Sequence, residues 1–499
     1  MKKSNIAVGV IVALGVLWTG AAWFTGKQLE SHKDELVQQA NARLQSWGPA
    51  STLTLTYQDY QRGIFSSHAK VVIQATAQTA DNAWLKPGQS IVLDETIDHG
   101  PFPLLQLKHF NVIPSLAAVH SELTNTDAVK KLFDLTDNKT PLVADTRVGY
   151  AGASHTVVNL LALDYQNTQT GERFASSGGE FTLGSDSKGD KVDFDLNLPN
   201  LAVTVKNEDN QPILYTVNNL KMDGNTYLSP EGVRIGDQTL SLDKTAVTVN
   251  GQETLTLDDF KINSSFDSKE NKIGGTIDYG IGKILLQQHD FGQSQLKLTV
   301  ANVDGQAMKT FSDNYNAQLQ DLLKQQGLAD DPVRYQEDVR AMLLQNLPVL
   351  LKGSPSVSIA PFTWKNSKGE SSFTLNANFN DPATVTGEAT DLSAVVDRVL
   401  KTLDAKLNIN MPMATEVMHQ VGLAEGYNAD DAQKMADQQV KGLAAMGQMF
   451  RLTQQKDDNI TTSLQYANGQ VTMNGDKMTL AQFMSRYMLG VPTNEGMPQ

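Results

Sequence analysis

The stretch Val192-Asp193-Phe194-Asp195-Leu196-Asn197-Leu198 alternates strictly between apolar and polar side chains. Because successive side chains of a β-strand point to opposite faces, this stretch predicts a strand with one apolar and one polar face. The same period of two persists from Thr146 to about Gly305, with turns rich in Gly, Asn and Asp between the runs. The pattern is typical of an antiparallel meander, and the Asn468-Gly469 pair near the C-terminus is its clearest hairpin signal.

Helical periodicity interrupts the strands in the second half of the chain. Apolar residues recur at helical spacing in 306–328, 332–347, 413–423 and 429–452. The last stretch carries a methionine-rich stripe, which we interpret as core packing, with a lipid- or partner-binding face as the alternative. The members of this stripe are Met435, Val440, Leu443, Met446 and Met449.

These patterns predict a β-dominated α+β fold: an N-terminal transmembrane helix followed by antiparallel β-meander sheets with packed helical hairpins. The sequence shows no regular alternation of strands and helices, so we do not expect a Rossmann or barrel enzyme fold. The predicted regions are a cytoplasmic tip and transmembrane anchor at 1–26, a stalk helix at 27–47, a β-rich periplasmic region at 48–305, a helical hairpin at 306–352, a mixed α/β region at 353–485 and a tail at 486–499.

The N-terminal segment predicts the location of the chain. Residues 6–26 read IAVGVIVALGVLWTGAAWFTG and contain no charged side chain. A helix of this length spans about 30 Å, which is the thickness of a bilayer's hydrocarbon core. Lys2 and Lys3 precede it, so the N-terminus is expected in the cytoplasm and the bulk of the chain outside it. A cleaved signal peptide with small residues at Gly20-Ala21-Ala22 is the alternative, but bulky Trp23 follows directly.

Composition and motifs exclude several functional classes. The net charge of −14 argues against nucleic-acid binding, which requires a concentrated basic face. The chain has no cysteine, which excludes disulfides, thiolate catalysis and cysteine-ligated metals. We find no phosphate-binding loop, no hydrolase motif and no histidine pair at metal-ligand spacing. We therefore assign no catalytic, cofactor-binding or metal-binding residue and expect that the protein is not an enzyme.

One local group could nevertheless carry chemistry. Asp98-His99 precedes Gly100-Pro101, and a carboxylate beside a histidine can orient the imidazole as a general base. However, adjacent residues on a strand point to opposite faces, which prevents a direct contact between these two side chains. We interpret the segment as a strand-ending turn, with a periplasmic hydrolase acting around Asp98 and His99 as the alternative function.

Several stretches resemble a known family. They are MKKSNIAVGVIVALGVLWTGAAWFTG at 1–26, YQRGIFSS at 60–67, DHGPFP at 98–103, AMGQMFRL at 445–452 and TTSLQYANG at 461–469. These stretches resemble the YdgA-like family of uncharacterised envelope proteins of Gram-negative bacteria, and the resemblance runs to about residue 480. It implies a single-pass inner-membrane anchor, a periplasmic body and self-association as a homodimer, and it carries no catalytic residues.

The predicted architecture also resembles the AsmA-type envelope proteins, whose long sheets with one apolar face shield lipid tails. This second likeness rests on architecture alone, which constrains function weakly. Together these observations predict a non-enzymatic periplasmic protein, anchored in the bacterial inner membrane, that presents an apolar sheet face or groove to a lipid or to an envelope protein.

Overall fold

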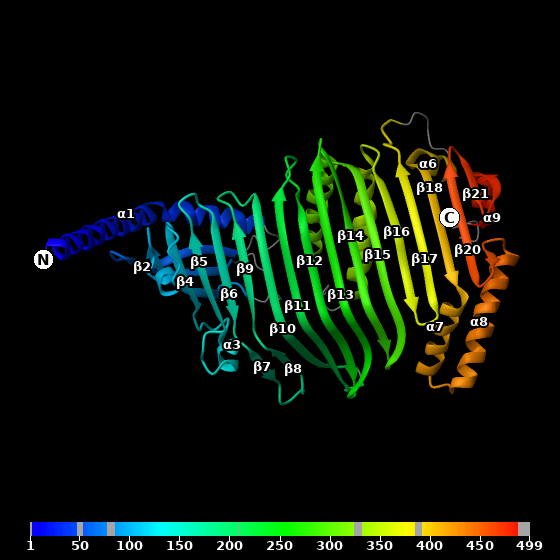
Figure 1. Cartoon of the computed structure of the whole chain (residues 1–499), viewed down its shortest axis with the longest axis horizontal. Coiled ribbons are helices and arrows are strands. Elements are labelled where there is room, and N and C mark those ends of the chain that lie inside the picture. Colours follow the sequence, from blue (N-terminus) through cyan, green and yellow to red (C-terminus); the bar gives the residue numbers. More distant parts are fainter. Residues whose placement is uncertain are drawn as a thin grey trace, which may run out of the picture. The chain divides into compact units, whose positions relative to one another are not determined.

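The computed structural model consists mainly of β-strands, the longest of which lie in the middle of the chain (Figure 1). The structure describes residues 2–46, 53–76, 85–207, 209–323, 332–384 and 392–487, with the side chains of 2–14, 43–46, 320, 323, 332 and 392 outside the description. The chain divides into two compact units, which we treat separately. Unit 1 comprises Met1–Val205, Asn218–Tyr227 and Asn316–Arg340, and unit 2 comprises Lys206–Val217, Leu228–Tyr315 and Ala341–Gln499.

Unit 1 contains an antiparallel sheet in the order β1-β2-β3-β4-β5-β6-β9-β10, and β7 and β8 form a hairpin whose second strand also pairs with β10. Its strands are β1 Leu53–Arg62, β2 Ser66–Ala75, β3 Ser90–His99, β4 Ala117–Leu123, β5 Leu142–Val148, β6 Ser154–Leu160, β7 Leu163–Gln166, β8 Arg173–Ser176, β9 Gly179–Ser185 and β10 Lys191–Lys206. Its helices are α1 Lys2–Ser46, α2 Leu104–Lys108 and α3 Lys130–Leu135.

Unit 2 contains an antiparallel sheet in the order β12-β13-β14-β15-β16-β17-β18-β20-β21-β22, with β19 also paired to β20. Its strands are β12 Arg234–Val249, β13 Gln252–Lys269, β14 Lys272–Leu286, β15 His289–Asp304, β16 Ser356–Asn366, β17 Gly369–Phe379, β18 Leu400–Asn410, β19 Gln454–Lys456, β20 Asn459–Ala467, β21 Gln470–Met473 and β22 Asp476–Thr479. Its helical elements are η2 Leu347–Leu351, α6 Leu392–Val399, α7 Met411–Ala424, α8 Ala429–Met449 and α9 Leu480–Tyr487.

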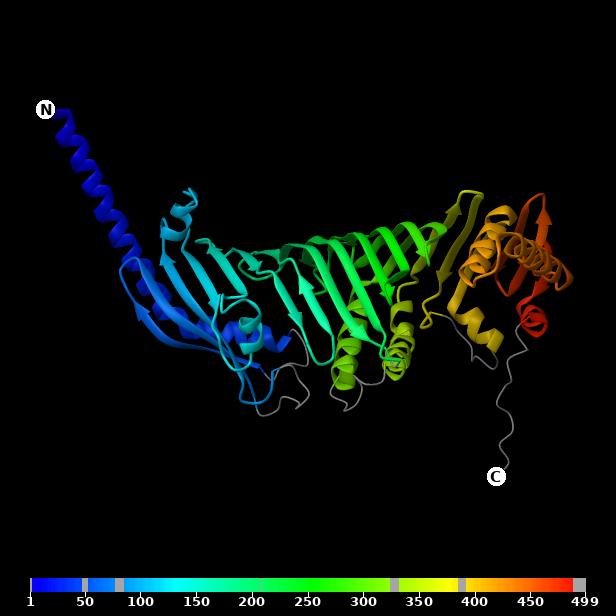
Figure 2. The ribbon, with the colours of Figure 1, turned by 90° about the horizontal axis from the view of Figure 1, so that it is seen from below.

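Four elements are divided between the units: β10, whose last residue Lys206 belongs to unit 2, β11 Pro212–Leu228, α4 Gly305–Leu323 and α5 Pro332–Asn346. Helices α4 and α5 lie where helical periodicity predicts them, and so do α7 and α8, which pack closely against each other (Figure 2). The predicted β-dominated α+β class is therefore confirmed, as are the long antiparallel sheets.

Strand register confirms the alternation that the sequence predicts for β10. Phe194 pairs with Leu183 of β9 and Leu196 pairs with Phe181, while Asp193 and Asp195 occupy the intervening positions. Because cross-strand partners lie on the same face, apolar side chains of β9 and β10 gather on one side of the unit 1 sheet.

Helix α1 is continuous from Lys2 to Ser46 and packs on the same sheet, mainly against β1. Leu29 packs on a small core made of Ala69, Ile97 and Ala117. The Asn41 amide donates to the Leu55 carbonyl at 2.9 Å and accepts from the Leu55 amide at 2.7 Å, as a neighbouring strand would.

The predicted membrane span lies in the first half of α1. The side chains of residues 6–14, within the predicted span, lie outside the described residues. Among the helices that the structure does describe, we find none both long and apolar enough to cross a bilayer.

Candidate functional sites

Asp98 and His99, which the sequence analysis singled out, are the last two residues of β3. His99 is 1% exposed, with Nε2 2.8 Å from Ser67 Oγ and Nδ1 3.1 Å from the Ile64 carbonyl. Burial lowers the pKa of His99, so the neutral ring predominates near neutral pH. In the matching tautomer Nδ1–H donates to Ile64, and Nε2 accepts from the Ser67 hydroxyl.

Asp98 has a separate role on the other face of β3. The Leu105 amide donates to Asp98 Oδ2 at 2.6 Å, which holds the first turn of α2 against the strand. The two side chains therefore do not meet, as strand alternation predicts. The structure instead brings His99 to Gly26 of α1, where an added Cβ would lie 2.3 Å from the ring.

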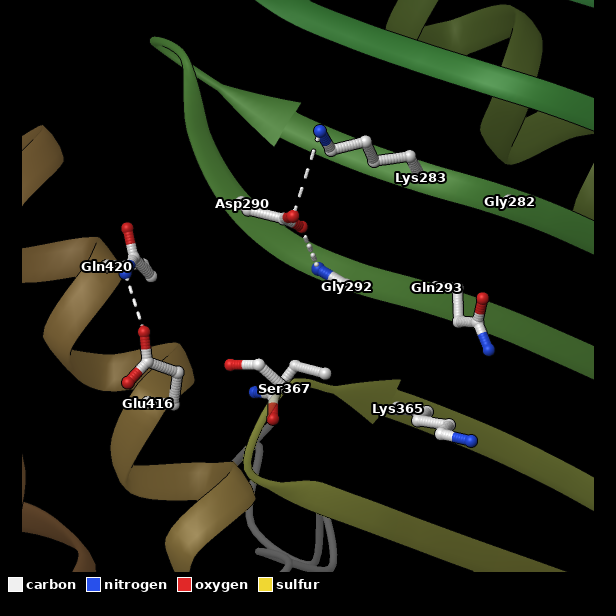
Figure 3. Close-up of a pocket in the computed structure, with 10 residues that line it drawn as sticks. Gly282, Lys283, Asp290, Gly292, Gln293, Lys365, Ser367, Glu416 and Gln420 are labelled. Atoms are coloured by element: carbon white, nitrogen blue, oxygen red, sulfur yellow. Dashed lines mark hydrogen bonds and ion pairs between the residues drawn. The ribbon is translucent and has the colours of Figure 1, made fainter.

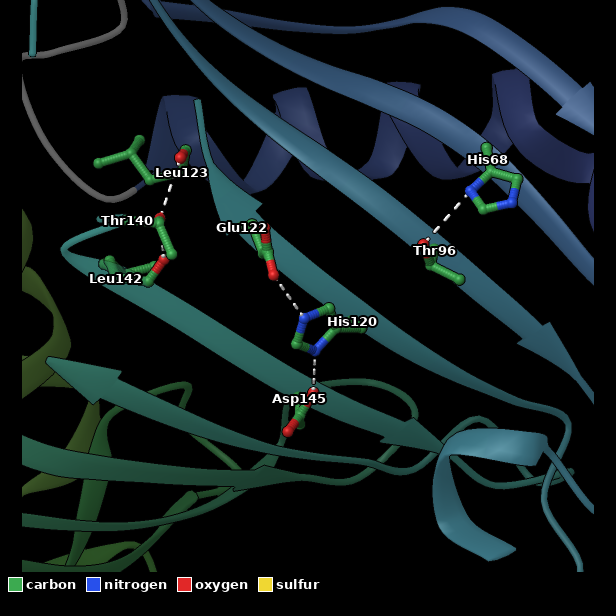
Figure 4. Close-up of polar contacts among 8 residues, drawn as sticks. All are labelled: His68, Thr96, His120, Glu122, Leu123, Thr140, Leu142 and Asp145. Atoms are coloured by element: carbon green, nitrogen blue, oxygen red, sulfur yellow. Dashed lines mark hydrogen bonds and ion pairs between the residues drawn. The ribbon is translucent and has the colours of Figure 1, made fainter. Parts of the chain in front are cut away.

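Strand pairing places His120 on the same face of the unit 1 sheet as Asp98. His120 belongs to a second polar group (Figure 4). His120 Nδ1 lies 2.6 Å from Asp145 Oδ1, and His120 Nε2 lies 3.1 Å from Glu122 Oε1. Burial lowers the pKa of His120, but the hydrogen bonds and charges of the two carboxylates outweigh burial and raise it above its usual value. Within the described part of the chain, no cluster of His, Asp or Glu has the geometry of a metal site. The three side chains form a hydrogen-bonded group on the polar face, which is ion-paired when His120 is protonated.

Glu95 is the most perturbed carboxyl group in unit 1. It lies on the same face of β3 as Ile97, is 9% exposed, and accepts a hydrogen bond from Ser121 at 3.4 Å. Burial raises the pKa of Glu95 to about 7. A carboxyl group with this pKa can exchange a proton near neutral pH, which is a property of many general acids and bases.

A polar pocket of about 670 Å³ lies in unit 2 between strands β14–β16 and helix α7 (Figure 3). Asp290 accepts from the Gly292 amide at 2.8 Å and lies 3.8 Å from Lys283 Nζ. Glu416 accepts from Gln420 at 2.6 Å on the opposite wall. These charged groups thus have partners of their own within the wall, and the arrangement contains no nucleophile–base pair.

Apolar side chains also line up across one face of the unit 2 sheet, which we call the apolar sheet face. Cross-strand pairing aligns one row of side chains over seven successive strands, and every member of the row is half-buried. The row consists of Leu240, Ile262, Tyr279, Leu296, Phe362, Phe373 and Leu407. A second row of mainly apolar pairs, including Ile277, Leu298 and Ile359, lies beside it.

Helices cover the apolar sheet face in part. Met413 and Val417 of α7 and the side chains of Phe362, Phe373 and Leu407 line an apolar cavity of about 240 Å³. At the C-terminal side of unit 2, residues from α6 and α9 form a hydrophobic core with strands β18, β20 and β21. The central part of the row is neither buried nor fully exposed, so an apolar molecule could complete its burial.

Most of the methionine-rich stripe on α8 is exposed, whereas the sequence predicts that it is buried. The buried side of α8 is formed by alanines together with Val440, and a Cβ added at Gly422 of α7 would lie 3.0 Å from the Cβ of Ala432. Met446 and Met449 are 50% and 68% exposed. The interpretation of the stripe as core packing is therefore confirmed for Val440 but wrong for Leu443, Met446 and Met449, because small residues are needed where the two helices approach closely.

The fold thus defines a chain of the β-dominated α+β class in which a single N-terminal helix leads into amphipathic antiparallel sheets. A family model described as a bacterial protein of unknown function, DUF945, matches residues 1–481. The chain belongs to this family.

Named relatives agree with this assignment. The chain is 45% identical over 504 residues to Protein YdgA of Escherichia coli (strain K12), with both chains covered in full. It is 30% identical over 495 residues to the uncharacterized protein YihF of the same organism, covering 97% of this chain and 98% of the relative. An uncharacterized Haemophilus influenzae protein is 29% identical over 174 residues, 34% of this chain and 45% of the relative. No solved structure matches the chain.

Proposed function

We propose that the protein is a non-enzymatic envelope protein, anchored in the bacterial inner membrane, whose apolar sheet face takes the acyl chain of a lipid. The observation that carries this proposal is the half-buried row from Leu240 to Leu407. Neighbouring strands lie about 4.8 Å apart, so seven strands make a row about 29 Å long. The hydrocarbon core of a bilayer is about 30 Å thick, so an acyl chain in one leaflet extends over roughly 15 Å. The row is therefore long enough for an extended acyl chain.

The chemistry of the face favours a lipid tail over a polar ligand. The row contains aliphatic and aromatic side chains, and Tyr279 supplies the one polar atom among its side chains. The polar side chains of the same strands, such as Lys261 and Asp278, occupy the intervening positions of the ladders. An apolar surface of this kind gains roughly 25 cal/mol for each Å² that a ligand removes from water.

The anchor in this proposal is the uncharged run at 6–26, preceded by Lys2 and Lys3. The orientation with a cytoplasmic N-terminus and a periplasmic body follows from the positive-inside rule. An anchored protein with an acyl-binding face would have its ligand close at hand in the same membrane. A second copy of the chain or another envelope protein is the alternative occupant of the face.

The proposal is tested with a pair of variants on adjacent residues of β13. Ile262→Ser removes an apolar side chain from the row, while Lys261→Ser changes the opposite face of the same strand. Full-length protein in vesicles of phosphatidylethanolamine and phosphatidylglycerol is irradiated with a photoactivatable acyl-chain analogue, and the labelled peptides are mapped. We expect labelling of β13–β16 in the wild type and Lys261→Ser, and at least a several-fold loss in Ile262→Ser.

Thermal unfolding of both variants controls for loss of structure. Absence of labelling on the apolar sheet face in the wild type would contradict the proposal. A protein that co-purifies with the wild type and is lost with Ile262→Ser, in place of lipid, would support the alternative of a protein partner.

A further inference from the structure

A segment of unit 1 between β3 and β4, which includes the short helix α2, exposes apolar side chains far from the apolar sheet face in the sequence. We call residues 101–113 the apolar loop. Phe110 is 93% exposed, Val112 is 67% exposed and Ile113 is 54% exposed. Contiguous exposed apolar side chains of this kind are rare on soluble surfaces and mark contact sites. The backbone of Phe110 has φ of 55°, a left-handed conformation that is uncommon for a bulky residue.

The apolar loop lies directly beside α1. Together they line an open apolar pocket of about 750 Å³. Its walls are Gly15, Leu17, Trp18 and Ala21 of α1 and Pro101, Phe102, Leu107 and Val112 of the loop. The neighbouring Val16 and Leu17 of α1 are themselves 67% and 68% exposed. The loop and this part of α1 therefore form one continuous apolar surface.

The length of the uncharged run fixes the depth of this surface. Residues 6–14 precede the pocket and would rise only about 14 Å as a helix, roughly half of the hydrocarbon thickness. If α1 spans the bilayer, residues 15–21 must lie within the hydrocarbon as well. Because the apolar loop packs beside those residues, it must then lie at the same depth.

Trp23 provides a second measure of depth. Its ring lies 5.5 Å from Lys27 Nζ and 5.7 Å from the Arg62 guanidinium carbon. Tryptophan and cationic side chains are favoured at the level of lipid headgroups. Leu17 lies six residues earlier, about 9 Å along the helix, which is within the depth that interfacial apolar elements reach.

We infer that the apolar loop enters the periplasmic leaflet of the bilayer beside α1 and forms a second membrane contact. The inference rests on the proposed anchor. The exposed Lys108 and His109 directly precede Phe110 in the sequence and are suited to phosphate groups at the surface. The docked α1 and the inserted loop together would hold unit 1 against the membrane.

The absence of cysteine makes a direct test simple. Single-cysteine variants Phe110→Cys, Val16→Cys and Tyr165→Cys carry an environment-sensitive fluorophore in the full-length protein. Tyr165 lies on β7 and is 39% exposed, so it reports an accessible part of unit 1 outside the proposed contact. Each labelled protein is reconstituted into vesicles of phosphatidylethanolamine and phosphatidylglycerol, with or without lipid carrying a doxyl quencher on its acyl chain.

We expect the quencher to reduce emission at positions 16 and 110 at least twofold and to leave position 165 unchanged. Quenching at position 16 without quenching at position 110 would leave the anchor standing and overturn the inserted loop. Loss of quenching at both positions would overturn the anchor and the loop together. Equal quenching at position 165 would indicate general adsorption to the membrane and would also overturn the inference. Circular dichroism of each variant confirms that the fold is retained.

Discussion

His99 and Glu95 occupy the same face of β3, yet burial moves their pKa values in opposite directions. Burial disfavours the charged form of each group, so it lowers the pKa of His99 and raises the pKa of Glu95 to about 7. Both groups are therefore neutral more often than they would be in water. This suits a face on which apolar side chains pack against α1.

At the residue scale, we predict that His99→Ala destabilises the protein. The substitution removes a buried ring and leaves Ser67 without one of its hydrogen-bond partners, which costs about 2–3 kcal/mol of unfolding free energy. Chemical denaturation measures the loss, and His109→Ala, at an exposed position, should change stability by less than about 0.5 kcal/mol. Loss of a cellular phenotype at normal stability and abundance would instead favour the hydrolase alternative.

Glu95 gives a prediction of pH dependence. Because its folded pKa of about 7 exceeds the ordinary value of 4.5, the folded state binds the proton more tightly than the unfolded chain. The contribution of Glu95 to stability is therefore fully present below about pH 4.5 and is lost as pH rises through about 7. Glu95→Gln should be more stable than the wild type at pH 8, and the difference should shrink at pH 5. Thermal melts over this range check it, and equal pH profiles would contradict the buried carboxyl group.

At the element scale, two glycines of the same helix separate helix propensity from packing. A Cβ at Gly26 would lie 2.3 Å from His99, whereas a Cβ at Gly20 meets nothing within 4 Å. Alanine is a better helix former than glycine by up to about 1 kcal/mol. We predict that Gly20→Ala is neutral or stabilising, while Gly26→Ala costs about 1–3 kcal/mol because α1 must shift away from β3.

The measurement for this pair is hydrogen exchange of the amides in β1 and β3 together with thermal unfolding. Faster exchange in Gly26→Ala, and unchanged exchange in Gly20→Ala, is the expected outcome. Equal effects of the two substitutions would mean that α1 does not dock on the sheet through Gly26.

At the scale of the whole molecule, the N-terminal segment should remain on the mature protein. The docking of Trp18 beside Phe65 and the complete burial of Ala22 give this part of α1 a role in packing unit 1. Intact-mass measurement of protein extracted from membranes should therefore correspond to a chain that includes residues 1–26. A mass that corresponds to a chain beginning near residue 22 or 23 would support a cleaved signal peptide and would contradict the proposed anchor.

Short-range patterns account for what the sequence by itself determined. The alternation from Val192 to Leu198 specifies a strand and its two faces, because side-chain direction depends only on position along the strand. The helical periods before β16 and after β18 specify α4, α5, α7 and α8 in the same way. Asn428 adds a local start signal for α8, since its side chain accepts from the Asp431 amide.

Tertiary structure alone decided which surfaces are covered. Ser67 and His99 are 32 residues apart, and their burial requires α1 to cross β3, which no local pattern encodes. Met446 is exposed because the close approach of α7 and α8 is made by small residues such as Ala432. Likewise, the exposed Phe110 gains significance only because folding places its loop beside α1. Periodicity indicates which face of an element is apolar. Whether other elements cover that face depends on contacts between segments that are distant in the chain.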